Sequence, residues 1–135
     1  MLAGVLASRL PRHRLVVDDP ETRVRHARGQ SLPDWVALRT GRLGAVPDGV
    51  AFPNNGAEVR ELLAWAAAVG ARVVPYGGGT SVVGGVTPAA DGSPWLTISL
   101  EHMAGLRALD DASLLATFGP GTAGPDVEAA LRARG

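Results

Sequence analysis

The chain has neither cysteine nor lysine among its 135 residues. Without cysteine it has no disulfide bonds, no thiolate metal sites and no cysteine nucleophile. Without lysine it has neither the lysine of a P-loop nor a lysine that forms a Schiff base. Since nothing in the chain calls for an oxidising compartment, we expect a cytoplasmic location.

Net charge and long apolar runs are also lacking. The 13 basic residues, all arginine, balance 13 acidic ones, which argues against a nucleic-acid partner or a membrane surface held by charge. No apolar run is long enough to span a bilayer. Residues 1–7 are apolar, but they are short and lack a basic leader, so we interpret them as a helix start or a ragged end rather than a signal peptide.

Histidine is scarce and scattered. His13, His26 and His102 are isolated from one another and from acidic residues at the spacing of metal ligands. We therefore expect no metal site. The hydrophobic content of 46% is that of a folded domain, and 135 residues are enough for one core.

A strand, helix and strand follow one another in the middle of the chain. Residues 50–53 read as a brief strand stopped by proline. Asn55 is placed to cap a helix that Gly70 ends. A second strand covers residues 72–75. The apolar face of the helix consists of Val59, Leu62, Leu63, Ala66 and Val69. This order predicts a βαβ unit with parallel strands and a right-handed crossover.

The remaining elements are expected from caps, turn residues and alternation. In chain order they are an Arg-rich peripheral segment over 1–30 with a short strand at 15–17, a helix over 32–40 with a capping box from Ser31 to Asp34, a half-buried strand at 95–100, a short helical turn at 102–106, a turn at 109–113, a strand at 114–118 and a helix that begins near Pro125.

The most distinctive stretch is the glycine-rich loop that follows the second strand. Three glycines at 77–79 precede Thr80 and Ser81, and two more glycines follow at 84–85. Glycine backbone can bend through positive φ or approach a ligand closely, and its N–H groups can form an anion-binding nest. The two hydroxyl groups add donors at the same place. The loop is thus either an anion site or a plain glycine-rich surface loop.

Two common phosphate motifs are excluded. A Walker A loop needs lysine, and the dinucleotide fingerprint G-x-G-x-x-G, counted from Gly77, meets Val82 at its third glycine. Gly84, Gly85 and Pro88 prevent a long helix from starting directly after the loop. An anion here would be held by the N–H groups and hydroxyls of the loop rather than by a helix dipole.

The segment Pro75–Ser81 resembles the pyrophosphate-binding segment of FAD-linked oxidases of the vanillyl-alcohol oxidase type, which carry a PCMH-type FAD-binding domain. Within that family the chain is most similar to the alkylglycerone-phosphate (alkyl-dihydroxyacetone-phosphate) synthase branch. The matched segments are 29–34, 46–50, 98–100 with Met103, and 119–121 with Leu131 and Gly135. They fall in the family's order and approximate spacing, so the resemblance covers residues 26–135.

The resemblance implies an α+β fold, in which a small parallel βαβ sheet flanked by helices is the first part of a two-subdomain FAD-binding domain. We expect a helical or irregular N-terminal segment over 1–45 and an FAD-binding domain over 46–135 that is truncated at its C-terminal side. The residues implied to wrap the FAD pyrophosphate are Pro75, Tyr76, Gly77, Gly78, Gly79, Thr80 and Ser81. Thr80 stands where some relatives carry a histidine that tethers the flavin, so we expect non-covalent FAD.

The implied function is FAD binding within a flavin-dependent oxidoreductase or an alkylglycerone-phosphate synthase-like enzyme of ether lipid biosynthesis. Its substrate would be a small molecule or a lipid precursor. The catalytic side chains of the branch lie in segments beyond this length, so no catalytic residue is assigned and the chain alone is not expected to be catalytically competent. Whether the chain is an enzyme stays open. Alternatives are part of a flavin-dependent 2-hydroxy-acid dehydrogenase and a non-enzymatic remnant domain.

Overall fold

The computed structural model describes residues 7–134. The expectation for the apolar start of the chain falls almost wholly on residues 1–6, outside the described residues. The elements are β1 (Val16–Val17), α1 (Pro20–Arg25), α2 (Leu32–Thr40), β2 (Gly49–Ala51), α3 (Gly56–Ala68), β3 (Arg72–Tyr76), β4 (Trp95–Ser99), the 3-10 turn η1 (Glu101–Met103), β5 (Leu106–Asp110), β6 (Leu115–Phe118) and α4 (Gly124–Arg132). The mixed α+β class is confirmed.

A four-stranded sheet has the order β1-β2-β4-β3. Both β2 and β3 pair in parallel with β4, and β1 pairs antiparallel with β2. The predicted βαβ unit is therefore confirmed as parallel, with β4 inserted between its two strands. The alternation of apolar and polar residues over 95–100 predicts a half-buried strand with one face toward solvent. For β4 this prediction is wrong. Because this strand is central and both of its faces are covered, Thr97 and Ser99 are fully buried.

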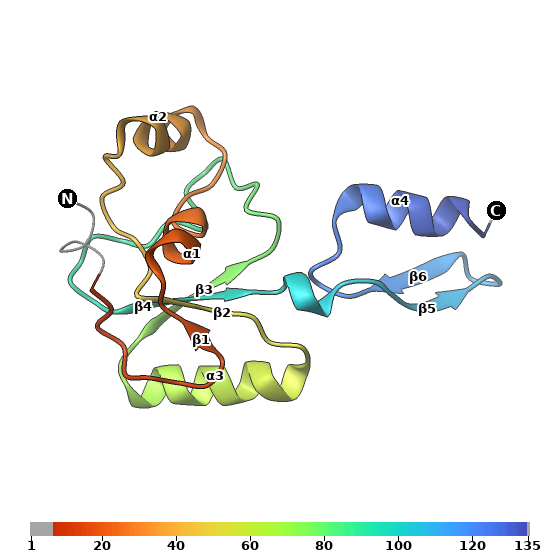
Figure 1. The fold of residues 1–135 in the computed structure, drawn as a ribbon. Coiled ribbons are helices and arrows are strands. Elements are labelled where there is room, and N and C mark those ends of the chain that lie inside the picture. The colour runs from red at the N-terminus through yellow and green to blue at the C-terminus, as the bar shows by residue number, and fades with distance from the viewer. Residues whose placement is uncertain (1–6, 135) are drawn as a thin grey trace.

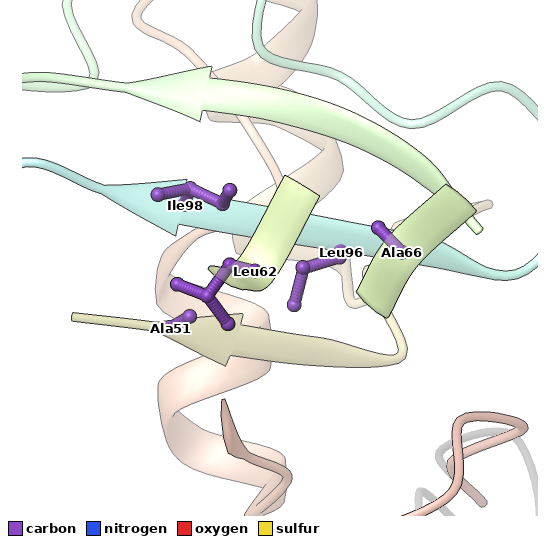
Figure 2. Close-up of a cluster of buried hydrophobic side chains, with 5 residues drawn as sticks. All are labelled: Ala51, Leu62, Ala66, Leu96 and Ile98. Carbon is purple, nitrogen blue, oxygen red and sulfur yellow. The ribbon is translucent and has the colours of Figure 1, made fainter. Parts of the chain in front are cut away.

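The core lies between α3 and one face of the sheet, while α1 lies on the opposite side (Figure 1). Figure 2 shows its five central side chains, which are Ala51, Leu62, Ala66, Leu96 and Ile98. Asn55 caps α3 by accepting from the N–H groups of Ala57 and Glu58. The prediction that Leu63 belongs to the buried apolar face of α3 is wrong, because Leu63 is 46% exposed. Successive residues of an α-helix are rotated by about 100°, so Leu63 points away from the core that Leu62 enters.

The capping box of α2 is confirmed. The Ser31 hydroxyl accepts from Asp34 N–H, and the Asp34 carboxylate accepts from Ser31 N–H. Sequence reasoning missed α1, which Asp19 caps and Pro20 begins. Its six residues are too few to show helical periodicity. Arg23 of α1 is buried and donates from Nε to Pro47 O at 2.6 Å, which fixes α1 against the segment before β2.

Beyond η1 the chain forms a second lobe of β5, β6 and α4, set apart from the four-stranded sheet (Figure 1). The strand predicted at 114–118 and the helix near Pro125 are both present. The helical turn predicted at 102–106 is too long, because η1 ends at Met103 and Leu106 already begins β5. The turn predicted at 109–113 is also wrong in part. Leu109 and Asp110 belong to β5, since the ladder with β6 continues to Asp110.

Two close backbone approaches attach the second lobe to the first. A Cβ at Gly119 would overlap Met103 O, and one at Gly121 would overlap Leu100 O. The N–H of Gly121 also donates to Met103 O at 3.4 Å. Over residues 7–134, no helix combines the length and apolar character that crossing a membrane requires.

Candidate functional site

The glycine loop, residues 77–85, begins at the carboxyl end of β3. Because β2, β3 and β4 are parallel, their carboxyl ends meet at one edge of the sheet. Ligands of open sheets with parallel strands bind at this edge. All seven residues implied by the resemblance, Pro75 to Ser81, therefore lie together at the edge where a ligand is expected.

The glycines of the loop differ in whether the fold itself needs them. Gly79 has φ +67° and a Cβ there would overlap the Tyr76 hydroxyl, so the fold requires glycine. Gly77 and Gly78 are exposed and do not have positive φ. A Cβ at Gly77 would meet nothing within 4 Å, and one at Gly78 only Thr80 Cγ2 at 3.8 Å. The close approach of a group from outside the chain would explain glycine at these two positions.

The backbone donors of the loop are available for such a group. The N–H groups of Gly78, Gly79 and Thr80 donate to no acceptor among the residues that the structure describes. Unused N–H groups on successive residues are the donors of an anion-binding nest. The loop thus fits a pyrophosphate by its donors and by the space at Gly77 and Gly78.

The two hydroxyl residues have different surroundings. Thr80 is exposed, whereas the Ser81 hydroxyl accepts from Gly85 N–H at 3.0 Å and so closes the far side of the loop. The Ser81 hydroxyl proton is still free to donate, since that bond uses only an oxygen lone pair. The Ser81 hydroxyl can therefore accept the bond that closes the loop and donate to a ligand at the same time.

Pro75 and Tyr76 precede the loop at the end of β3. Pro75 is exposed on this edge strand, where the missing N–H of proline is tolerated. Tyr76 is half-buried and its hydroxyl donates to Arg25 O at 3.3 Å. Burial, and to a smaller extent the negative charge of Glu101, raises the pKa of Tyr76 above its usual value, so the phenol keeps its proton. The sequence leaves open whether Tyr76 touches a cofactor or covers the loop. In the structure its ring lies over Gly79.

An aromatic cluster next to the loop was missed from the sequence. The His26 ring lies 4.7 Å from that of Tyr76 and 5.5 Å from that of Phe52, and the His102 ring lies 5.5 Å from Phe52. His26 is held by Nδ1, which is 2.8 Å from Thr22 O. Three of these rings lie at or just after the carboxyl end of a parallel strand, namely Phe52, Tyr76 and His102. This shared position at the strand ends is the sequence signal that could have predicted the cluster.

A polar atom at this edge also lacks a partner. Ser99 is paired in register with Tyr76 and its buried hydroxyl has no hydrogen-bond partner among the described residues. Arg28 Nε is also buried without a partner among the described residues, but the Arg28 guanidinium lies beside Gly44, in the segment before β2. No group of three or more histidine or acidic side chains placed to hold a metal ion occurs within residues 7–134. The donors described at this edge are the N–H groups of the loop and neutral hydroxyl groups.

The chain is similar in sequence to several known proteins. Alkyldihydroxyacetonephosphate synthases of Dictyostelium discoideum and Trypanosoma brucei brucei are 29% and 33% identical to the chain over 118 and 115 residues, covering 87% and 84% of it. Glycolate oxidase subunit GlcD of Bacillus subtilis (strain 168) is 30% identical over 96 residues, or 71% of the chain. The chain spans only about a fifth of the length of these curated relatives, 19%, 19% and 20%.

A solved structure of an alkyldihydroxyacetonephosphate synthase superposes with a TM-score of 0.84 at 28% identity. The match covers 90% of this chain and 22% of that structure. The model of the FAD-binding domain family matches residues 47–135, a range that includes β3 and the whole glycine loop. The chain therefore belongs to the FAD-binding domain family, as the resemblance at Pro75–Ser81 implies.

Proposed function

We propose that this chain binds FAD without a covalent bond and that residues 75–81 surround its pyrophosphate. One observation supports this above the others: Gly77 and Gly78 have no reason within the chain to be glycine, and N–H groups beside them have no acceptor. The family implies a flavin cofactor, and the pyrophosphate is the part of FAD that a nest of N–H donors suits.

The loop has no side chain suited to a flavin tether. Residues 77–85 contain only glycine, threonine, serine and valine. Thr80 and Ser81 supply hydroxyl donors, and the protonated phenol of Tyr76 keeps the first turn of the loop in place. When bound, FAD would supply the redox or adduct chemistry, while these residues bind and orient it.

A titration of the purified chain with FAD tests the proposal. We expect the fluorescence of FAD to change on binding and the absorbance spectrum of the bound flavin to shift. Gly78→Val should abolish the change, because the β-branched side chain fills the space beside the N–H donors. Gly124→Ala is the matched control, since a Cβ there also meets nothing within 4 Å and the residue is far along the chain in α4. A folded chain that ignores FAD would refute the proposal.

For the protein of which this domain would be a part, we propose an alkyldihydroxyacetonephosphate synthase-like activity on a lipid precursor. The high TM-score and the two synthase relatives support this. The relative named glycolate oxidase subunit GlcD supports oxidation of a small 2-hydroxy acid as a second candidate. Exchange of an acyl for an alkyl group without an electron acceptor would favour the first. Acceptor-dependent oxidation of a hydroxy acid would favour the second, and neither activity would favour a non-enzymatic remnant.

The domain division at residues 45 and 46 and the cytoplasmic location stay predictions. Limited proteolysis would test the first, because a flexible boundary would be cut near residue 45. Fractionation of cells that express the chain would test the second.

A further inference from the structure

Two hydrogen bonds connect the glycine loop, and Tyr76 directly before it, to the segment that runs from the end of α1 to the start of α2. Gln30 N–H donates to Ser81 O at 2.7 Å, and the Tyr76 hydroxyl donates to Arg25 O at 3.3 Å. The first holds the middle of the loop and the second holds its start. We call residues 25–30 the N-terminal clasp.

Gly29 shows how closely the clasp and the loop approach. It is buried, it does not have positive φ, and a Cβ there would overlap Ser81 O and lie 3.0 Å from Ser81 C. These are backbone atoms, so no side-chain rotation relieves the overlap. On another side the same Cβ would lie 3.4 Å from Asp34 Oδ2, which belongs to the capping box of α2. Glycine is needed at this position because the two backbones touch.

The clasp is itself fixed at both ends. Upstream, buried Arg23 of α1 donates to Pro47 O at 2.6 Å. Downstream, the capping box of Ser31 and Asp34 begins α2 directly after Gln30. His26 within the clasp also packs its ring against Tyr76. A segment held in this way can hold the loop in one position.

We infer that the N-terminal clasp positions the glycine loop for the FAD pyrophosphate, and that Gly29 is its principal positioning residue. The inference rests on the proposed function and extends the site to residues that precede the family match at 47–135. The clasp acts through Ser81 and Tyr76, and it sets where the free N–H groups of the loop point.

Gly29→Ala tests the inference, with Gln30→Ala as its matched control. Gly29→Ala must push the backbone of Ser81 away, so we expect FAD to bind at least about tenfold more weakly, which is the effect of losing a hydrogen bond to a charged group. Gln30 is exposed and contributes its backbone N–H to the contact, which alanine keeps, so its variant should bind FAD as the parent chain does. Circular dichroism and tryptophan fluorescence report whether each variant is folded.

A readout independent of FAD is the exchange of the Gln30 amide proton, followed by NMR. In the parent chain its bond to Ser81 O should slow exchange, and Gly29→Ala should remove that protection and shift the amide resonances of Gly77–Thr80. If Gly29→Ala does not fold, Tyr76→Phe takes its place, because it removes only the hydroxyl that reaches Arg25 O. It should also weaken FAD binding.

The outcomes separate the two proposals. A folded Gly29→Ala that binds FAD within twofold of the parent chain overturns the inference, as does an unaffected Tyr76→Phe where the first variant is unfolded. If the parent chain binds no FAD, the proposed function fails for this chain. The clasp is then judged on the NMR measurement alone, and unchanged Gln30 exchange and loop resonances in Gly29→Ala reject it.

Discussion

The two lobes of the chain differ in where their apolar side chains lie. In the first lobe, α3 and the four-stranded sheet enclose a core of fully buried residues. In residues 101–134 only Gly119 is buried, and Leu114 and Leu115 are 89% and 66% exposed. An open groove of about 490 Å³ lies on the second lobe. Its apolar lining consists of Leu109, Leu114, Leu115, Ala116, Phe118, Val127 and Leu131.

The difference shows which lobe supplies the stability. The second lobe has only Gly119 buried, and it is shorter than the roughly 40 residues below which a domain usually needs a disulfide, a metal or a partner to be stable. Its attachment to the first lobe depends on backbone contacts of Gly119 and Gly121 with residues 100–103. The first lobe carries both the core and the glycine loop, so the proposed FAD contacts depend on the more stable half.

Truncating a core residue should give the largest effect. Leu62→Ala removes a fully buried side chain from between α3 and the sheet, and we expect it to lower the free energy of unfolding by about 2–5 kcal/mol. Leu115→Ala, in the second lobe, should change it by less than about 0.5 kcal/mol. Thermal and urea unfolding measure both. Equal losses would mean that the lobes contribute equally and that the comparison is wrong.

Next in size is a buried carboxylate of the first lobe. Asp48 is 1% exposed and accepts from Arg9 Nε at 2.8 Å, Arg9 Nη2 at 2.7 Å and Trp95 N–H at 2.8 Å. Burial alone would raise the pKa of Asp48, but hydrogen bonds from Arg9 and from Trp95 N–H outweigh it and hold the pKa below its usual value. Asp48→Asn replaces a carboxylate oxygen, which accepts these hydrogen bonds, by an NH₂ group that can only donate. It should therefore lower the free energy of unfolding by about 2 kcal/mol.

The pH dependence follows from the lowered pKa. Stability from Asp48 is complete above its unfolded pKa of about 4 and is lost as the pH falls through the lower folded value. Denaturant titrations from pH 6 to pH 2 should show this loss in the parent chain, reduced in Asp48→Asn. Asp110 of the second lobe also has a lowered pKa, from hydrogen bonds with Ser113, but it is fully exposed. Asp110→Asn should have the smaller effect, and the reverse order would contradict the comparison.

The two kinds of glycine in the loop give a third and finer test. Gly79→Ala forces an L-residue into φ +67° and displaces Tyr76, so it should cost about 1–2 kcal/mol of unfolding free energy. Gly78→Ala should leave stability within about 0.5 kcal/mol of the parent, because neither its φ nor its surroundings oppose a Cβ. FAD titration should then show weakened binding in the Gly78 variant although its unfolding is unchanged. If Gly78→Ala unfolds as readily as Gly79→Ala, glycine at 78 is a requirement of the fold.

Local signals in the sequence predicted local structure well. The capping box at Ser31 and Asp34, the Asn55 cap and the Gly70 end each depend on neighbouring residues, and all are present. The insertion of β4 between β2 and β3 depends on pairing across many residues, and nothing local encodes it. The same holds for the site. The loop was recognisable from its glycines and hydroxyls, whereas the contact of Gly29 with Ser81 appears only when two distant backbones meet.

The smallest effect should come from the hairpin turn of the second lobe. Leu114 has φ +53°, a conformation that costs an L-residue about 1 kcal/mol and that asparagine tolerates better. Leu114→Asn should therefore stabilise the hairpin by about 0.5 kcal/mol, measured as slower amide exchange along β5 and β6. Leu115→Asn is the control. Leu115 lies in β6 without positive φ, and asparagine is disfavoured in strands, so exchange should become faster. Faster exchange in Leu114→Asn would instead mean that the exposed leucine is covered in solution, and the contrast between the lobes would then hold only for the isolated chain.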